Sequence, residues 1–137
     1  MTLFIDTSVF YAIADRSDRS NLRAKAIIRD NEQRLTTDHV LIETWLLIQR
    51  RLGSAAADAF WSGARAGVVM IETVTAADLE AAFVIGETFP DQSFSIVDRT
   101  SFVALQRLGI RRVASFDNDF AIYRYGPKRD RAFEIVA

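Results

Sequence analysis

Short apolar runs alternate with longer, helix-patterned segments along the whole chain, and this alternation restricts the fold more than any other feature. Five runs are compatible with β-strands: 2–6, 35–37, 68–74, 112–116 and 132–136. Strands that alternate with helices predict an α/β fold, here a three-layer α/β/α sandwich around a mostly parallel sheet. The run at 68–74 (VVMIETV) is almost continuously apolar, which is typical of a strand covered on both faces.

Helices are expected between these strands, because most of the intervening segments have a start or stop signal. The expected ranges are 8–14, 22–34 capped by Ser20, 40–52 ended by Gly53, 54–67, 76–89 capped by Thr75 and 96–108 begun by Ser95, with a further helical turn at Asp117. Leu22, Ala26 and Ile27 define the inner face of the second helix. Linkers, repeats and low-complexity segments are absent, so residues 1–137 are expected to form one domain.

The composition restricts the chemistry of any site. There is no cysteine and a single histidine, His39, which excludes thiolate and multi-histidine metal sites. A metal ion would therefore be held by oxygen, which favours Mg²⁺ or Mn²⁺. No apolar stretch approaches the ~20 residues that span a bilayer, and the N-terminus lacks secretory character, so a cytoplasmic location without membrane contact is expected.

Four acidic residues occupy positions that a parallel sheet brings together. Asp6 ends the first strand, and Asp117 follows the fourth. Asp98 lies in the first turn of the helix before the fourth strand, and Glu43 lies early in the helix after the second. Because ligands bind at the carboxyl ends of such strands, these four side chains are expected to face one edge of the sheet.

Each acid also has a structural interpretation. Asp6 and Asp117 are suited to cap helices, and Asp98 follows Ser95 at the spacing of a capping box. Glu43 is harder to explain, because Ile42, Leu46 and Leu47 surround it with apolar side chains. His39 is one turn before Glu43, where a role at the start of the helix explains it first.

The convergence of the four acids favours a metal site. Gathered carboxylates repel one another, and a divalent cation removes that penalty. Mg²⁺ commonly uses one or two carboxylates and keeps several waters, so four acids can serve one or two ions. Such a site supports phosphodiester hydrolysis by a metal-activated water, without a side-chain nucleophile.

Four motifs occur in order along the chain: Asp6-Thr7-Ser8, Glu43 in an apolar helix, Ser95-Ile-Val-Asp98 and Ser115-Phe-Asp117-Asn-Asp119. Together they resemble the PIN-domain family, specifically VapC-type toxins of bacterial toxin–antitoxin pairs. The resemblance covers nearly the whole chain. It implies an α/β/α sandwich, Mg²⁺ or Mn²⁺, and endonucleolytic cleavage of RNA. It also implies a homodimer and a small VapB-like antitoxin whose tail covers the site.

The resemblance assigns the metal-binding and catalytic roles to Asp6, Glu43, Asp98 and Asp117. Asp119 matches a variable position and is treated as auxiliary. Ser8 and Ser115 match hydroxyl positions that orient carboxylates.

Two other functions remain open from the residues. An aspartyl phosphatase would use Asp6 as its nucleophile, but it would want a second acid where Ser8 stands and a phosphate-binding lysine, and only Lys25 and Lys128 exist. A PIN-like binding module without activity would pair with a partner, although the intact acidic set argues against a loss of activity.

The formal net charge of −1 does not by itself indicate an RNA-binding surface, because nucleic-acid-binding domains are usually basic. The candidate surface is the C-terminal segment, in which basic residues outnumber acids; its basic members are Arg107, Arg111, Arg112, Arg124, Lys128, Arg129 and Arg131.

Overall fold

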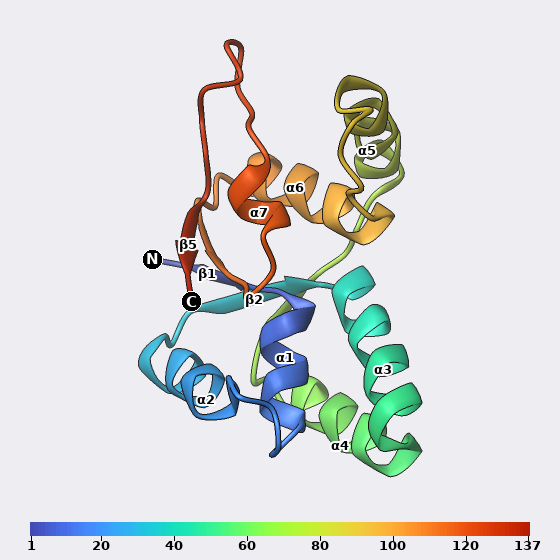
Figure 1. The fold of residues 1–137 in the computed structure, drawn as a ribbon, viewed down its shortest axis with the longest axis vertical. Coiled ribbons are helices and arrows are strands. Elements are labelled where there is room, and N and C mark those ends of the chain that lie inside the picture. The colour runs from blue at the N-terminus through green and yellow to red at the C-terminus, as the bar shows by residue number, and fades with distance from the viewer.

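A central sheet of five parallel strands organises the computed structural model, which describes all residues from 1 to 137 (Figure 1). The strands lie in the order β3-β2-β1-β4-β5. Their bounds are β1 Leu3–Ile5, β2 Arg34–Thr37, β3 Met70–Glu72, β4 Arg112–Ala114 and β5 Glu134–Val136. All four pairings are parallel, which confirms the predicted α/β sandwich.

Seven helices accompany the sheet: α1 Thr7–Ala14, α2 Asn21–Asp30, α3 Asp38–Leu52, α4 Ser54–Arg65, α5 Ala76–Thr88, α6 Ile96–Leu108 and α7 Asp119–Ile122. Figure 1 shows α1, α2 and α4 beneath the sheet and α5, α6 and α7 above it, while α3 begins beside the sheet and runs down next to α4. None of these helices is long and apolar enough to cross a membrane.

The order of the strands positions the candidate site. From β1 the chain builds outward to β2 and β3, then crosses back and adds β4 and β5 on the opposite side of β1. Helices therefore leave β1 and β4 toward different faces of the sheet, as Figure 1 shows. In parallel α/β sheets such a reversal opens a crevice at the carboxyl ends of the two strands.

The core explains why β1 is central. Leu3, Phe4 and Ile5 are fully buried, as expected for a strand with neighbours on both edges and helices on both faces. On the α6 and α7 side the core is aromatic. Phe102 lies at its centre, stacked on Tyr123 at 4.2 Å and edge-on to Phe120 at 5.1 Å between ring centroids.

Two expectations for the segments around β2 and β3 were wrong. Helix α2 ends at Asp30 rather than at residue 34, because the Arg34 guanidinium donates to the carbonyls of Ile28 and Asn31 while its backbone joins β2. Strand β3 is an edge strand with Met70 and Ile71 exposed, so its apolar run is not covered on both faces.

The inner face of α2 also differs from the expected one. Ala24 and Ile27 are buried in the core, whereas Leu22 is 81% exposed. Leu22 therefore lies on the solvent side of α2, whereas Asn21 in the same turn is buried and donates to the Ala12 carbonyl.

An ion pair between α5 and α6 supports a test of the packing above the sheet. Arg107 holds the buried carboxylate of Asp78 with two hydrogen bonds, Nε to Oδ1 at 3.0 Å and Nη2 to Oδ2 at 2.8 Å. We predict that Arg107→Ala lowers the free energy of unfolding by about 2 kcal/mol, less than for a fully buried pair because Arg107 is partly exposed. Chemical denaturation measures this loss. The matched control is Arg111→Ala, at an exposed arginine without a side-chain partner, and equal losses in the two variants would contradict the assignment.

Candidate active site

Asp6 is the best-enclosed acid of the candidate site. It follows β1 directly, its backbone N–H donates to the Ala114 carbonyl of β4, and only 3% of the residue is exposed. Although Asp6 occupies the N-cap position of α1, its side chain makes no capping hydrogen bond. The capping interpretation is therefore wrong for Asp6.

Two hydroxyl groups hold the Asp6 carboxylate instead. Ser8 Oγ and Ser115 Oγ both donate to Asp6 Oδ2, at 3.0 and 2.9 Å. Each hydroxyl accepts a backbone N–H in return, from Phe116 at 2.9 Å and from Asp117 at 3.1 Å. These N–H groups approach the oxygens as donors, so they leave the hydroxyl protons free to point at Asp6. Ser8 and Ser115 thus make the carboxylate contacts expected of them.

The pKa of Asp6 is raised to about 6, mainly because burial penalises the charged form. The hydrogen bond from Ser115 lowers this pKa, and the nearby Asp117 carboxylate raises it. The two hydroxyls therefore compensate only part of the cost of burying this charge.

Asp98 belongs to the capping box of helix α6 and also lies near other acidic residues of the site. Its Oδ2 accepts the Ser95 N–H at 3.1 Å, while Ser95 Oγ accepts the Asp98 N–H at 3.0 Å, so the predicted capping box is present. Burial, a side-chain hydrogen bond with Asp119 and the negative charges of Asp119 and Asp6 together raise the pKa of Asp98 to about 7, although the hydrogen bond from the Ser95 N–H lowers it. Capping thus engages only one carboxylate oxygen of Asp98.

Asp117 and Asp119 complete the aspartate group. Asp117 is exposed and caps no helix, because α7 begins after Asn118. Loss of hydration raises the pKa of Asp117, and Asp119 raises it further. Asp119, which the sequence placed in an auxiliary role, thus repels both Asp98 and Asp117. The Asp-Asn-Asp spacing was the only sequence signal for this closeness.

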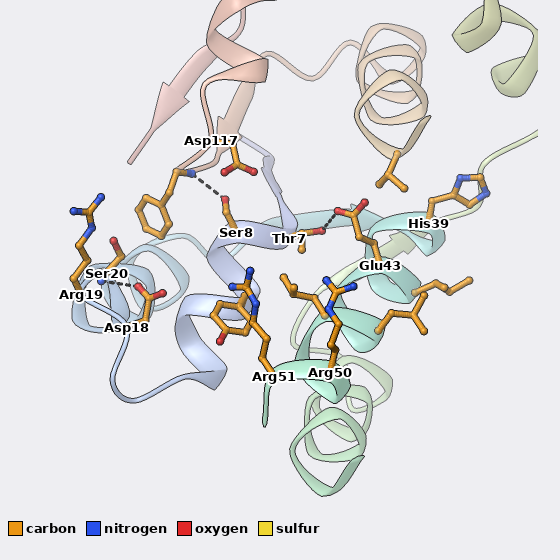
Figure 2. A pocket seen from close by; sticks show the side chains of 16 residues that line it. Thr7, Ser8, Asp18, Arg19, Ser20, His39, Glu43, Arg50, Arg51 and Asp117 are labelled. Carbon is orange, nitrogen blue, oxygen red and sulfur yellow. Dashed lines mark hydrogen bonds between the residues drawn. The ribbon is translucent and has the colours of Figure 1, made fainter. Parts of the chain in front are cut away.

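Glu43 faces the same cleft as Asp117 from α3, as Figure 2 shows. Its Oε1 accepts a hydrogen bond from Thr7 Oγ1 at 2.8 Å. The reason for singling out Glu43 was partly wrong, because its neighbours Ile42 and Leu46 are 51% and 54% exposed. Thr7 is a residue that sequence reasoning missed, since its contact with Glu43 spans 36 positions.

The acidic side chains suit a hard divalent ion in type but do not form a closed cage. No three of them stand close enough together to hold one ion in the present arrangement. Mg²⁺ does not require such a cage, because it usually binds through one or two carboxylates and keeps several waters. Burial and neighbouring carboxylates raise the pKa values of Asp6, Asp98 and Asp117, and none of the three forms a salt bridge. A bound cation would offset this cost of keeping them ionised.

Parallel α/β sheets bind their ligands at such a reversal point, and a group of aspartates there is suited to hydrolysis assisted by an oxygen-bound metal ion. The PIN domain family model matches residues 3–124. The chain is 35% identical over 120 residues to "23S rRNA-specific endonuclease VapC20" from two strains of Mycobacterium tuberculosis, covering 87% of this chain and 92% of the relative.

The chain therefore belongs to the PIN domain family and is a homologue of the VapC20 toxin endonuclease, which confirms the predicted family and endonuclease class. The crystal structure of M. tuberculosis VapC20, described as a sarcin-ricin loop cleaving toxin, superimposes with a TM-score of 0.83 at 34% identity, covering 87% of this chain and 92% of that one.

More distant structures share the fold. A toxin–antitoxin complex from Klebsiella pneumoniae aligns with a TM-score of 0.64 at 14% identity, covering 100% of this chain and 97% of that one. FitAcB from Neisseria gonorrhoeae aligns with a TM-score of 0.59 at 15% identity, covering 85% and 88%.

The repulsion at Asp98 generates a prediction for the metal-free protein. In the folded state the pKa of Asp98 is raised from 3.8 to about 7, so ionised Asp98 destabilises the fold. This loss of stability is absent below pH 3.8, grows as the pH rises and is complete above about pH 7. Asp98→Asn keeps a capping oxygen and removes the charge. We therefore expect this variant to melt about 2–5 °C higher than the wild type at pH 8 in EDTA, with a much smaller gain at pH 4.5.

Thermal unfolding at the two pH values measures this difference, and Asp91→Asn, at an exposed acid, serves as the control. An equal gain for Asp98→Asn at both pH values would show that the charge of Asp98 is not the cause.

Proposed function

We propose that this chain is a Mg²⁺- or Mn²⁺-dependent endoribonuclease and the toxin of a toxin–antitoxin pair. The observation that carries the proposal is the enclosed Asp6 carboxylate at the carboxyl ends of the paired strands β1 and β4. It is held by Ser8 and Ser115 and lies near further aspartates. The homology to VapC20 supplies the reaction class.

At most two of Asp6, Asp98 and Asp117 would contact the ion directly, and the third, together with Glu43 and Asp119, would contact it through water. Bound there, the ion would supply a water of lowered pKa and neutralise charge on the phosphodiester. Ser8 and Ser115 keep the Asp6 carboxylate in one orientation, which lowers the reorganisation needed for binding. Thr7 does the same for Glu43, and Thr44 Oγ1 donates in turn to Thr7 Oγ1 at 3.3 Å.

Ribosomal RNA is the proposed substrate class. The relatives that are 35% identical over 87% of this chain are named for cleavage of 23S rRNA, and the similar crystal structure is described as a toxin that cleaves the sarcin-ricin loop. The cleft that contains Asp117 and Glu43 has a volume of about 800 Å³ and is open to solvent, which suits a polymer that must enter from outside.

A small VapB-like antitoxin and a second copy of this chain are the proposed protein partners. The two distant structural relatives include a toxin–antitoxin complex, which supports the first. Exposed apolar side chains on α3 and α5 (Ile42, Leu46, Leu79 and Phe83) support the second, since a solvated monomer gains nothing from exposing them.

Removing a proposed ligand tests the site directly. We predict that Asp6→Asn and Asp98→Asn each reduce Mg²⁺- or Mn²⁺-dependent cleavage of ribosomal RNA by about 100-fold or more, because each removes charge from the group that holds the ion. EDTA should stop the wild type. Glu87→Gln, which removes an exposed charge on α5, should cleave at the wild-type rate.

A second readout does not depend on finding the correct RNA. Mn²⁺ should raise the melting temperature of the wild type and have little effect on Asp6→Asn, because a ligand bound only by the folded state stabilises it. Full metal-dependent cleavage by Asp6→Asn would overturn the site assignment. Release of phosphate from small phosphomonoesters, without cleavage of RNA, would favour the phosphatase alternative.

A further inference from the structure

The cleft that contains Glu43 and Asp117 is also lined by three arginines. Arg50 and Arg51 come from the last turn of α3, and Arg19 comes from the segment before α2. Figure 2 shows the guanidinium groups of Arg50 and Arg51 directed toward the level of Thr7 and Glu43, with Arg19 on the other side of the cleft. The same cavity is thus lined by three arginines and by three acids, namely Asp18 beside Arg19 and, in another part, Glu43 and Asp117.

These arginines are not used in ion pairs. The salt bridges of the protein involve Arg29, Arg107 and Arg112, and none involves a cleft arginine. Arg51 lies over the Tyr11 ring, with its guanidinium carbon 5.2 Å from the ring centroid. Its guanidinium also interacts with the Tyr11 hydroxyl and is attracted to the Asp15 carboxylate, but it forms no salt bridge, so these contacts orient Arg51 without neutralising it.

In contrast to the cleft arginines, several basic residues of the C-terminal segment have hydrogen-bonding partners within the protein. Arg107 is paired with Asp78 and Glu72, and Arg112 is hydrogen-bonded to Asn31 and lies 3.9 Å from Glu134. Arg124 donates to three consecutive carbonyls at the end of α7, from Ala121 to Tyr123. Three of the seven basic residues expected to contact RNA therefore have structural partners.

The positions of Arg50 and Arg51 also have an explanation that involves no ligand. Basic residues in the last turn of a helix interact favourably with the helix dipole, which accounts for Arg50 and Arg51 without any ligand. It does not account for Arg19, which lies outside a helix and faces the same cavity. Two separate segments thus supply unpaired guanidinium groups to one cleft.

Helix geometry places the arginines apart from the acids. Seven residues separate Glu43 from Arg50 on α3, which corresponds to about 10 Å along the helix axis. No salt bridge joins Arg50 or Arg51 to Glu43 or Asp117. A phosphate bound by these arginines would therefore be a neighbour of the phosphate at the aspartates and not the same phosphate.

We infer that Arg19, Arg50 and Arg51 bind backbone phosphates of the RNA that flank the cleaved bond, and that this cleft, not the C-terminal segment, is the main RNA-binding surface. The inference rests on the proposed endoribonuclease function and extends it to the residues that position the substrate. Arginine suits this role because its planar group donates two parallel hydrogen bonds to a phosphate and stays charged at all relevant pH values.

The test compares Arg50→Gln/Arg51→Gln with a control that removes the same charge from the C-terminal segment, Arg111→Gln/Lys128→Gln. Binding of a fluorescent single-stranded RNA is measured in EDTA across a series of salt concentrations, and cleavage kinetics are measured with Mn²⁺. Thermal unfolding confirms that both variants are folded.

For the cleft variant we expect binding weaker by about tenfold or more and a salt slope (log K against log salt) smaller by about 1.4, since each contact with a single strand contributes about 0.7. KM should rise while kcat stays within about twofold. The control should resemble the wild type in all three measurements.

Two results would overturn the inference: unchanged binding and salt slope in the cleft variant, or a larger loss in the C-terminal control. A fall in kcat with unchanged KM would also overturn it, because the arginines would then act on the reaction itself. Failure of the proposed function is a separate outcome, in which the wild type does not cleave RNA. The salt slope in EDTA still decides in that case whether the arginines bind RNA.

Discussion

A buried carboxylate at the end of the central strand is the constraint on which the site depends. Asp6 is enclosed because β1 has β2 on one side and β4 on the other, so the residue that leaves β1 enters the junction between two layers of helices. Burial of a charged group costs free energy unless partners compensate for the lost hydration. Two serine hydroxyls compensate in part, and the pKa of Asp6 remains raised.

The surrounding acids increase this cost instead of relieving it. Asp98 and Asp117 both have raised pKa values, and neighbouring carboxylates contribute to each shift. A fold selected only for stability would replace one of these residues with an amide or a base. The proposed ligands of opposite sign, a cation at the aspartates and phosphates at the arginines, would account for the presence of these acids together with arginines that form no salt bridge in the same cleft.

Structural and functional roles are not exclusive in this site. Asp98 was ambiguous in the sequence because a capping box explains it fully, and the structure contains that capping box. The same carboxyl also lies near Asp119 and Asp6, because the first turn of α6 begins at the carboxyl edge of the sheet. The two interpretations of Asp98 were therefore compatible from the start.

The sequence predicted what depends on local pattern and strand order. Alternating strands and helices were sufficient for the fold class, and the rule on carboxyl ends was sufficient to bring Asp6 and Asp117 to one edge. Apolar periodicity could not distinguish an edge strand from a central one, so β3 was wrongly expected to be covered on both faces. It also could not show that Ile42 and Leu46 face solvent. The contact of Thr7 with Glu43, and the placement of Arg19 and Arg50 in one cleft, depend on how distant segments pack, and no local pattern encodes them.

Crystals soaked in Mn²⁺ would test the central claim most directly, through anomalous diffraction at the carboxyl edge of β1 and β4. We expect anomalous density within coordination distance of an Asp6 oxygen and of at least one of Asp98 and Asp117, and we expect it to disappear in Asp6→Asn crystals grown under the same conditions. Saturating Mn²⁺ without anomalous density at these aspartates, or density only at surface acids away from β1, would contradict the account.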